Sequence, residues 1–385
     1  MVRGNKDESQ QDTKATVLNW ESKIIAPIGS LSHKITDLLD VIGNLKLLKV
    51  INLDWSEIRQ LPKAIGMMRN LEKLLARCCR NLHGEIPSEI PGLSVSRILN
   101  LSSSGISRLP TTIDQLTHLQ ELHLQCCDDL QQLPRLPTSL TKLDFRSSML
   151  QTVPDLSNMT NLVDLSISDG TDGIDFGSRV ERGQLQAQNI DWVVRLTRLE
   201  KLALVLSDSI QLTDLCPLSR LQRLKISCFD PDSLMQYPSS LKSLTLVDLK
   251  SPTKWSSLSS LKNLHTLMIQ RSRLEKIHFD VLGQLKNLQS LQVSRCKFLE
   301  RLSNLSHLKE LKILWVSQCP KLTEIQGFEE LEMLQYLVIY ECYVCRSLTE
   351  RYQRPTLDST VTLLELRSLR LPGKKSMQRF GFKDQ

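Results

Sequence analysis

One spacing, L-x-x-L-x-[LVI]-x-x-C, occurs in four stretches of the chain: LQELHLQCC (residues 119–127), LQSLQVSRC (288–296), LKILWVSQC (311–319) and LQYLVIYEC (334–342). Alternate side chains of a strand point to opposite faces, so the apolar residues of x-Leu-x-Leu-x point inward and the residues between them point outward. A unit that cannot bury its apolar face alone must stack on copies of itself. The spacing therefore predicts a stack of strands with a shared core.

Looser copies of the unit extend over most of the chain. Eleven of the thirteen gaps between their first residues measure 20–25 residues. We number each repeat from that first inward residue, which gives fourteen candidate repeats that begin at Leu48, Leu71, Ser96, Leu119, Leu140, Leu162, Leu199, Leu221, Leu241, Leu264, Leu288, Leu311, Leu334 and Leu366. This is the pattern of a leucine-rich repeat. It predicts an α/β solenoid, a leucine-rich-repeat horseshoe with a parallel concave sheet and short 3₁₀, helical or extended convex connections.

Proline and small residues support this register. Leu61-Pro62, Leu109-Pro110 and Leu133-Pro134 fall between strands, where a residue without an N–H does no damage to a sheet. The position eight residues after the first leucine should close the turn after the strand with a small inward side chain. It is occupied by Ser56, Cys79, Ser104, Cys127, Ser148, Ser207, Ser272, Cys296, Cys319 and Cys342.

The ends and one insertion interrupt the array. We expect a disordered tail over 1–16 and a cap or degenerate repeat over 17–41. The repeats should occupy 42–342, with a Gly- and Asp-rich surface loop over 168–191. Residues 343–385 should form an irregular last repeat, a cap and a tail, because an open end would expose core leucines and strand edges.

Composition limits the class of protein. The net charge is +7, yet the 49 basic residues are scattered and form no run interleaved with aromatic residues, which argues against nucleic-acid binding. Neither a signal peptide nor a membrane-spanning stretch is found in the sequence. Cysteine placement follows the repeat, which favours free thiols in a reducing compartment. We expect a protein of the cytoplasm, and a location in the nucleus also agrees with these features.

Three phrases resemble a particular plant family. They are IRQLPKAIGMMRNLEKL (58–74), ISRLPTTIDQLTHLQELHLQCCDDLQQLPRLPTSLTKLDF (106–145) and VPDLSNMTNLVDLSIS (153–168). They look like the repeat region of plant intracellular disease-resistance receptors that carry an N-terminal TIR domain and a nucleotide-binding domain. The resemblance implies recognition of pathogen effectors or host proteins, defence signalling, and autoinhibition through a sister nucleotide-binding domain. LHGEIP (82–87) resembles the extracellular plant repeat instead, but it occurs once.

The chain departs from that family outside the repeats. It contains no Gly-x-x-x-x-Gly-Lys-Ser/Thr motif and no TIR-like segment, so neither nucleotide switching nor NAD cleavage carries over. Two interpretations stay open: a part of such a receptor, or a stand-alone cytosolic repeat scaffold in signal transduction.

Two groups of outward residues are candidate partner-binding sites on the concave face. The first is apolar and consists of Ile313, Trp315, Tyr336, Val338 and Tyr340. Such a patch on a surface marks a protein contact, unless residues 343–365 fold over it. The second is basic and suits an acidic partner, or it is an ordinary solvated face; it consists of Lys73, Arg77, Lys142, Arg146, Lys201, Arg223 and Lys225.

No residue pattern predicts chemistry. Cys342-Tyr-Val-Cys345 lacks the second cysteine pair that a structural zinc site needs, and the seven histidines are dispersed. We therefore expect a non-catalytic protein with no metal and no cofactor, whose partners are other proteins.

Overall fold

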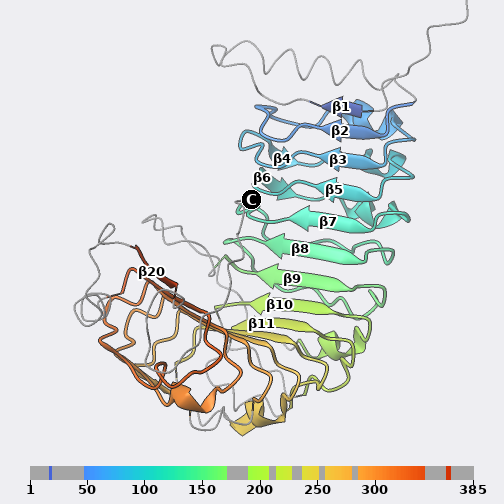
Figure 1. Ribbon diagram of the computed structural model, residues 1–385. Helices are drawn as coiled ribbons and strands as arrows, with labels where there is room; N and C mark the ends of the chain where they lie inside the picture. The colour runs from blue at the N-terminus through green and yellow to red at the C-terminus, as the bar shows by residue number, and fades with distance from the viewer. Residues whose placement is uncertain are drawn as a thin grey trace, which may run out of the picture. The chain divides into compact units, whose positions relative to one another are not determined.

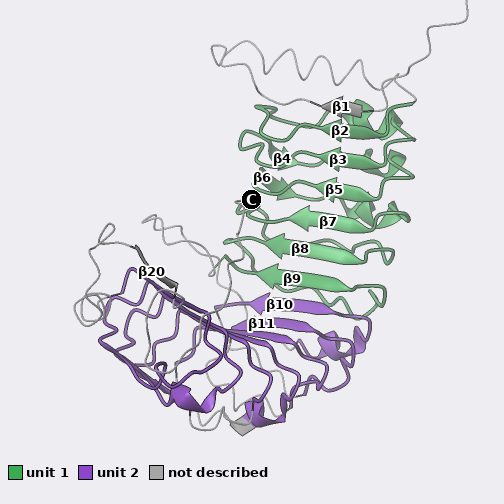
Figure 2. Ribbon diagram, viewed as in Figure 1, with its two compact units in different colours: residues 1–186 green, residues 187–385 purple. Residues whose placement is uncertain are grey.

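The computed structural model describes residues 17–19, 47–170, 190–207, 214–227, 236–250, 256–279, 285–342 and 361–365. The chain divides into two units, residues 1–186 and 187–385, which Figure 2 colours separately. Each unit is a solenoid whose repeats each add one strand to a parallel sheet (Figure 1). Most of the predicted loop 168–191 lies outside the described residues, as do the tail 1–16, most of 17–41, and 343–360.

Parallel strands of successive repeats form the sheet of the first unit. They follow the order β1 (Val17–Asn19), β2 (Val50–Asn52), β3 (Lys73–Leu75), β5 (Ile98–Asn100), β7 (Glu121–Leu124), β8 (Lys142–Arg146) and β9 (Asp164–Ser168). Equivalent positions lie side by side, so that Leu74 pairs with Leu99 and Leu99 with Leu122. The strand β1 pairs in parallel with β2, with Leu18 beside Ile51.

The second unit repeats this arrangement. Its sheet follows the order β10 (Lys201–Val205), β11 (Arg223–Ser227), β12 (Ser243–Val247), β13 (Thr266–Gln270), β15 (Ser290–Ser294), β17 (Ile313–Ser317), β19 (Tyr336–Tyr340) and β20 (Val361–Glu365). The strands from β10 to β19 are parallel, with Leu267 beside Leu291 and Leu291 beside Leu314. The predicted fold class of a leucine-rich-repeat solenoid is confirmed.

The last strand of the sheet differs from the others. The strand β20 runs antiparallel to β19, with Leu363 opposite Val338. It occupies the edge of the sheet beyond β19, and the predicted fourteenth repeat, from Leu366, lies outside the described residues. An antiparallel return of the chain supplies partners for the N–H and C=O groups that an edge strand leaves open.

The inward residues form the core of each unit. Leu122 in the first unit and Leu267 and Leu314 in the second are 0% exposed. Each fully buried leucine stabilises the fold by about 1.5–3 kcal/mol relative to exposure, most of which is offset by chain entropy. A continuous row of such residues explains why each repeat depends on its neighbours.

Short 3₁₀ helices and extended segments connect the strands. The helices are η1 (Lys63–Met67), η2 (Ile90–Gly92), η3 (Thr111–Gln115), η4 (Asp191–Arg195), η6 (Ser256–Ser260) and η8 (Leu305–His307). Pro62 and Pro110 stand directly before η1 and η3 in extended conformation, as their spacing predicts. Additional strands lie in the connections and pair as β4 (His83–Glu85) with β6 (Gly105–Arg108), and as β14 (Lys276–His278), β16 (Arg301–Ser303) and β18 (Glu324–Ile325).

Two glycines allow η1 and η2 to approach closely. A Cβ atom on Gly92 would lie 1.8 Å from the carbonyl oxygen of Gly66. A Cβ on Gly66 would lie 2.2 Å from the carbonyl oxygen of Glu89. The obstacle is backbone in both cases, so no side-chain rotation relieves it.

The turn after the strand has an unusual backbone. In nine repeats the residue at position seven, counted as seven residues after the first inward residue, has a positive φ, between 52° and 65°. It is never glycine. These residues are Trp55, Cys78, Ser103, Cys126, Asp248, Arg271, Arg295, Gln318 and Glu341. In a regular strand the side chain at position seven would point inward, because it lies two residues after the inward position five. The left-handed backbone at position seven interrupts this alternation, so the side chain at position eight points inward instead. The buried Ser56, Cys79 and Ser104 follow this rule.

Two of the predicted eighth-position residues are wrong. Ser147 is fully buried and Ser148 only half-buried, while Leu206 is buried and Ser207 exposed. Neither Ser147 nor Leu206 has a positive φ, so in these repeats the alternation continues and position seven points inward.

A long apolar helix able to cross a membrane is not found in the described part of the chain.

Candidate functional site

The outward side chains of the sheet form the candidate site. Each repeat contributes the positions two, four and six residues after its first inward residue. The register places equivalent positions of neighbouring repeats beside one another. In the second unit one such row consists of Thr245, Met268, Gln292, Trp315 and Val338.

The apolar end of this face consists of Ile313, Trp315, Tyr336, Val338 and Tyr340. Ile313 pairs with Tyr336, Trp315 with Val338 and Ser317 with Tyr340, so the five side chains share one face of β17 and β19. Trp315 is 42% exposed, whereas Val338 is 7% exposed. Trp315 is therefore the main surface of the apolar end, and the two tyrosines flank its partner Val338 along β19.

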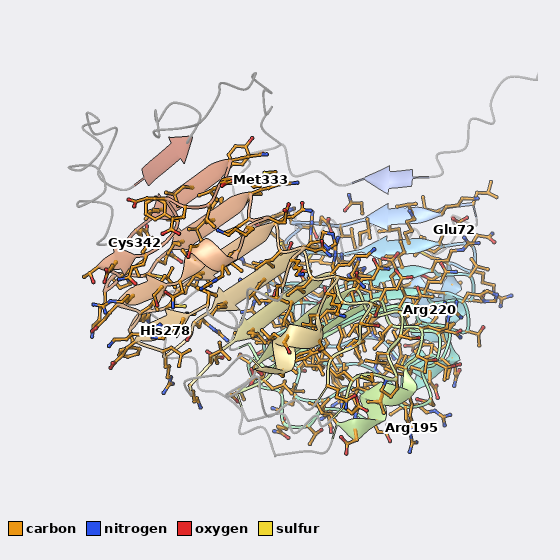
Figure 3. All side chains as sticks on the ribbon, turned by 60° about the horizontal axis from the view of Figure 1, so that its bottom comes forward. Glu72, Arg195, Arg220, His278, Met333 and Cys342 are labelled. Atoms are coloured by element: carbon orange, nitrogen blue, oxygen red, sulfur yellow. The ribbon has the colours of Figure 1, made fainter. Side chains whose placement is uncertain are left out.

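Two neighbours bear on the apolar end. The strand β20 pairs edge to edge with β19, and residues 343–360, which the sequence allows to cover the patch, lie outside the described residues. The Tyr340 hydroxyl donates a hydrogen bond to the Glu341 carboxylate, which raises the pKa of Tyr340 and lowers that of Glu341. Figure 3 draws the side chains on the ribbon and labels Met333 and Cys342, which flank β19 in the sequence.

The neutral middle of the face lies on β12, β13 and β15. Its nine outward residues carry hydroxyl, amide, thioether or aliphatic groups and no ionisable group: Ser243, Thr245, Val247, Thr266, Met268, Gln270, Ser290, Gln292 and Ser294. Several are short and buried, such as Thr245 at 7% and Ser290 at 9% exposure. The middle is therefore an uncharged surface of buried and half-buried side chains.

The basic end of the face consists of Lys201, Arg223 and Lys225 on β10 and β11. Lys201 pairs in register with Arg223, and Lys225 lies two residues further along β11. Lys201 and Arg223 are exposed and Lys225 is half-buried. The structure thus brings these three of the seven predicted basic residues together.

The other four basic residues lie in the first unit as two separate pairs. Lys73 and Arg77 belong to one repeat, and Lys142 and Arg146 to another, with the outward residues of β5 and β7 between them. Arg77 forms an ion pair with Asp54 at 3.3 Å between Nη2 and Oδ2. The face of the first unit mixes acids with bases.

A polar cluster on β7 and β8 was missed by the sequence reasoning. His123 Nε2 lies 2.9 Å from Glu121 Oε2, and Gln125 donates a hydrogen bond from Nε2 to the Asp144 carboxylate. Asp144 is only 9% exposed, and burial raises its pKa. The available signal was the fourth position of adjacent repeats, where His123 and Asp144 pair in register.

The cysteines that close the turns after the strands are buried. The eight described cysteines are free thiols. Cys127 Sγ donates to the Leu101 carbonyl oxygen at 3.2 Å, and burial raises its pKa to about 12. The hydrogen bond with Cys296 raises the pKa of Cys319 to about 12 as well. These two thiols therefore stay protonated at neutral pH and donate hydrogen bonds within the core.

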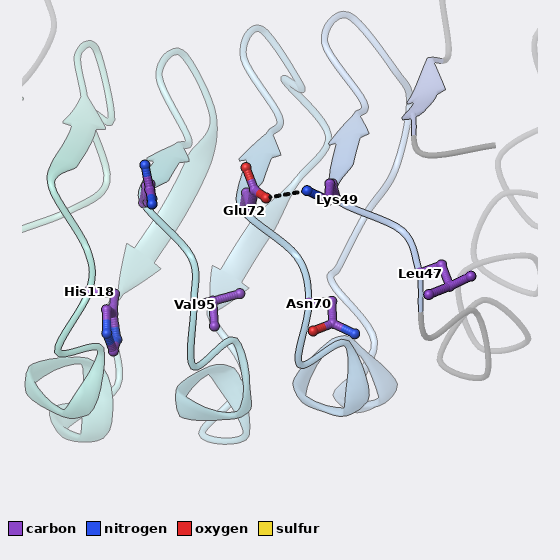
Figure 4. A pocket seen from close by; sticks show the side chains of 7 residues that line it. Leu47, Lys49, Asn70, Glu72, Val95 and His118 are labelled. Atoms are coloured by element: carbon purple, nitrogen blue, oxygen red, sulfur yellow. Dashed lines mark ion pairs between the residues drawn. The ribbon is translucent and has the colours of Figure 1, made fainter. Parts of the chain in front are cut away.

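Two shallow hollows lie away from the outward face. The larger, about 570 Å³, is on the side of the first unit, where Lys49 Nζ and Glu72 Oε1 form an ion pair at 2.9 Å (Figure 4). Lys49 lowers the pKa of Glu72. Leu47, Val95 and His118 also line it, one from each of three repeats. Among the described residues no group of three or more His, Cys, Asp or Glu side chains is placed to hold a metal ion.

The chain was compared with solved structures. A leucine-rich repeat protein of Leptospira interrogans matches with a TM-score of 0.51 at 22% identity, covering 82% of this chain and 85% of that one. InlJ from Listeria monocytogenes, whose functional domain includes a cysteine ladder, gives 0.48 at 17% identity, covering 78% and 64%. The repeat ectodomain of the plant membrane receptor kinase GASSHO1/SCHENGEN3 from Arabidopsis thaliana, in complex with CASPARIAN STRIP INTEGRITY FACTOR 2, gives 0.39 at 17% identity, covering 79% and 48%.

At these identities the likeness concerns the fold alone. No curated protein sequence is significantly similar to the chain. The profile described as "Leucine-rich repeat region" matches residues 78–297, more than half of the chain. Together with the inward leucines and the parallel strands, this match shows that the chain belongs to the leucine-rich repeat family, whose solenoids are protein-interaction scaffolds.

Proposed function

We propose that this chain is the protein-recognition region of a plant intracellular disease-resistance receptor of the TIR and nucleotide-binding class. In this role it binds a pathogen effector, a host protein or a sister nucleotide-binding domain, performs no catalysis, and mediates defence signalling or autoinhibition in the cytoplasm or the nucleus. The family resemblance of residues 58–74, 106–145 and 153–168 supports the class of receptor.

The outward face of the sheet supports recognition as the function. Trp315 is 42% exposed in the middle of a strand, so its ring adds little to the stability of the solenoid itself. Such an exposed aromatic side chain is typical of a surface that a protein partner buries. The outward lysines and arginines add a positive potential that would steer an acidic surface toward the sheet. Each of the twelve predicted outward residues belongs to the proposed contact surface of its own unit.

Binding to purified domains tests this function. The immobilised chain would be exposed to nucleotide-binding domains of plant receptors of this class and, in parallel, to Ras-type GTPases. We expect micromolar or tighter binding of at least one nucleotide-binding domain, weakened about tenfold by Lys73→Glu on the sheet. Arg69→Glu, which changes another exposed cation that lies off the sheet, is the matched control.

The outcomes separate the two functions left open by the sequence. Binding of a GTPase alone would favour a stand-alone scaffold in signal transduction. Binding of neither class, or equal loss in both variants, would contradict the proposed receptor role.

A further inference from the structure

The second unit carries its charge at one end of the outward face. From β10 to β19 the outward positions of the described strands include three cations and no acidic residue. All three cations lie at the basic end. The neutral middle comes next, on β12, β13 and β15, and the apolar end comes last, on β17 and β19. The face is therefore graded in chemistry along the direction that crosses the strands.

Exposure differs along the face as well. Thr245, Ser290 and Ser317 are less than 10% exposed, and the longer Met268, Gln270 and Gln292 are half-buried. Among the outward residues of β12 to β19, Trp315 alone is exposed. A ligand that lies across these strands therefore meets buried and half-buried side chains and one exposed aromatic anchor.

The separation of the two ends fixes the size of the ligand. Five inter-strand steps separate β10, which carries Lys201, from β17, which carries Trp315. At about 4.8 Å per step this is about 24 Å, which an extended chain spans in about seven residues at roughly 3.3 Å each. A short peptide segment can thus reach both ends at once.

We propose that the outward face of the second unit binds an extended segment of a protein partner. The segment places carboxylates over Arg223 and Lys201, and an apolar or aromatic residue against Trp315 about seven residues away. Uncharged polar residues cross the neutral middle, where a charge would lose water without gaining a partner. This inference rests on protein recognition as the function, and it names the chemistry, length and orientation of what is recognised.

A displayed library of random twelve-residue peptides, selected on the full chain, tests the inference. Enriched peptides should hold Asp or Glu about seven residues from Trp, Phe or Leu. Trp315→Ala should weaken a selected peptide at least tenfold, and Trp55→Ala, which removes a 59% exposed tryptophan from the first unit, should not. Arg223→Glu should weaken it similarly, and Arg220→Glu, which changes an exposed cation three residues earlier and off the sheet, should not.

Two refinements make the result decisive. Exchanging the acidic residues of the peptide for lysines should restore binding to Arg223→Glu. Shortening the spacer by three residues should cost at least tenfold, because the peptide then no longer reaches both ends. An enriched set without the acidic and apolar pattern, insensitivity to both face variants, or no enrichment at all would overturn the inference. Binding of a folded nucleotide-binding domain would survive each of these outcomes, so failure here is distinct from failure of the proposed function.

Discussion

The outward faces of the two units use the same strand positions for different chemistry. In the first unit, ionisable side chains pair on the face itself: Arg77 forms an ion pair with Asp54, and the His123 ring lies 2.9 Å from the Glu121 carboxylate. In the second unit, the described outward positions from β10 to β19 hold cations at one end and no acid. A partner of the first unit must compete with existing pairs and desolvate them, whereas a partner of the second unit meets a neutral floor.

This difference shows that the repeat constrains the inward residues and allows the outward residues to vary. Inward positions are held to aliphatic residues by the shared core, so Leu122 and Leu314 have the same environment in the two units. Outward positions contribute little to that core and can change without unfolding it. Specificity within this family can therefore differ between parts of one solenoid.

The largest effect should come from a charge in the core of the second unit. Leu291 is 0% exposed and lies between Leu267 and Leu314, so Leu291→Asp buries a carboxylate without a partner. We expect a loss of more than about 4 kcal/mol, which should unfold the repeats of the second unit while β2 to β8 keep their amide protection. Hydrogen exchange measured by mass spectrometry would report both units at once.

Gln292→Asp is the matched control, because the same change falls on the outward face of the same strand. It should leave amide protection intact. A Leu291→Asp protein that melts like the parent would show that the inward register is wrong.

The next effect concerns the connections of the first unit. In Gly92→Ala the new Cβ would meet the Gly66 carbonyl oxygen at 1.8 Å, so η1 and η2 must separate. We expect a destabilisation of about 1–3 kcal/mol, which exceeds the gain from a stiffer unfolded chain. Urea unfolding is the measurement, with Gly105→Ala as the control, since its Cβ would meet its nearest atom at 3.3 Å. Equal midpoints for Gly92→Ala and the parent would contradict this close packing.

The sequence was sufficient for everything that depends on period. The inward leucines, the parallel register, the extended and 3₁₀ connections and the side-by-side placement of Trp315 and Val338 all follow from counting residues. The left-handed conformation of the turn could not be predicted in this way. Its position holds residues as different as Trp55, Arg271 and Glu341, and never a glycine that would indicate a positive φ. Ser147 and Ser148 are chemically identical, so only the backbone decides which one is buried.

Two other features depend on contacts that counting does not reveal. The segment before Leu366 forms an antiparallel strand, although the residues from Leu366 onward carry the repeat spacing. The hydrogen bond from Gln125 to Asp144 crosses diagonally between positions six and four, and it depends on side-chain rotamers.

A smaller, stabilising effect is expected at the left-handed turn. Trp55 has a φ of 65° and is 59% exposed, so its ring contributes little while its Cβ crowds the backbone. Trp55→Gly should raise the free energy of unfolding by about 1 kcal/mol, because glycine adopts this conformation without the Cβ penalty. Trp55→Ala removes the ring and keeps the Cβ, so thermal unfolding of the two variants isolates the strain. If both variants behave alike, the turn carries no strain.

The smallest effect tests how the first unit tolerates its own charges. Burial raises the pKa of Asp144, so the folded state binds its proton more tightly than the unfolded state does. The stability that this proton contributes is present below the unfolded pKa and is lost as pH rises through the folded pKa. Asp144→Asn should therefore stabilise the protein at pH 7, on the order of 0.5 kcal/mol, while its amide oxygen still accepts from Gln125.

The gain from Asp144→Asn should shrink as the pH falls toward about 4, near the unfolded pKa of an aspartate. Urea unfolding of variant and parent at pH 7 and pH 4 measures this difference, with the exposed Asp129→Asn as the control. A gain that is constant with pH would mean that the charge of Asp144 is not the cause. A gain that follows the predicted direction would mean that the first unit keeps a destabilising carboxylate on its outward face, a cost that the uncharged middle of the second unit avoids.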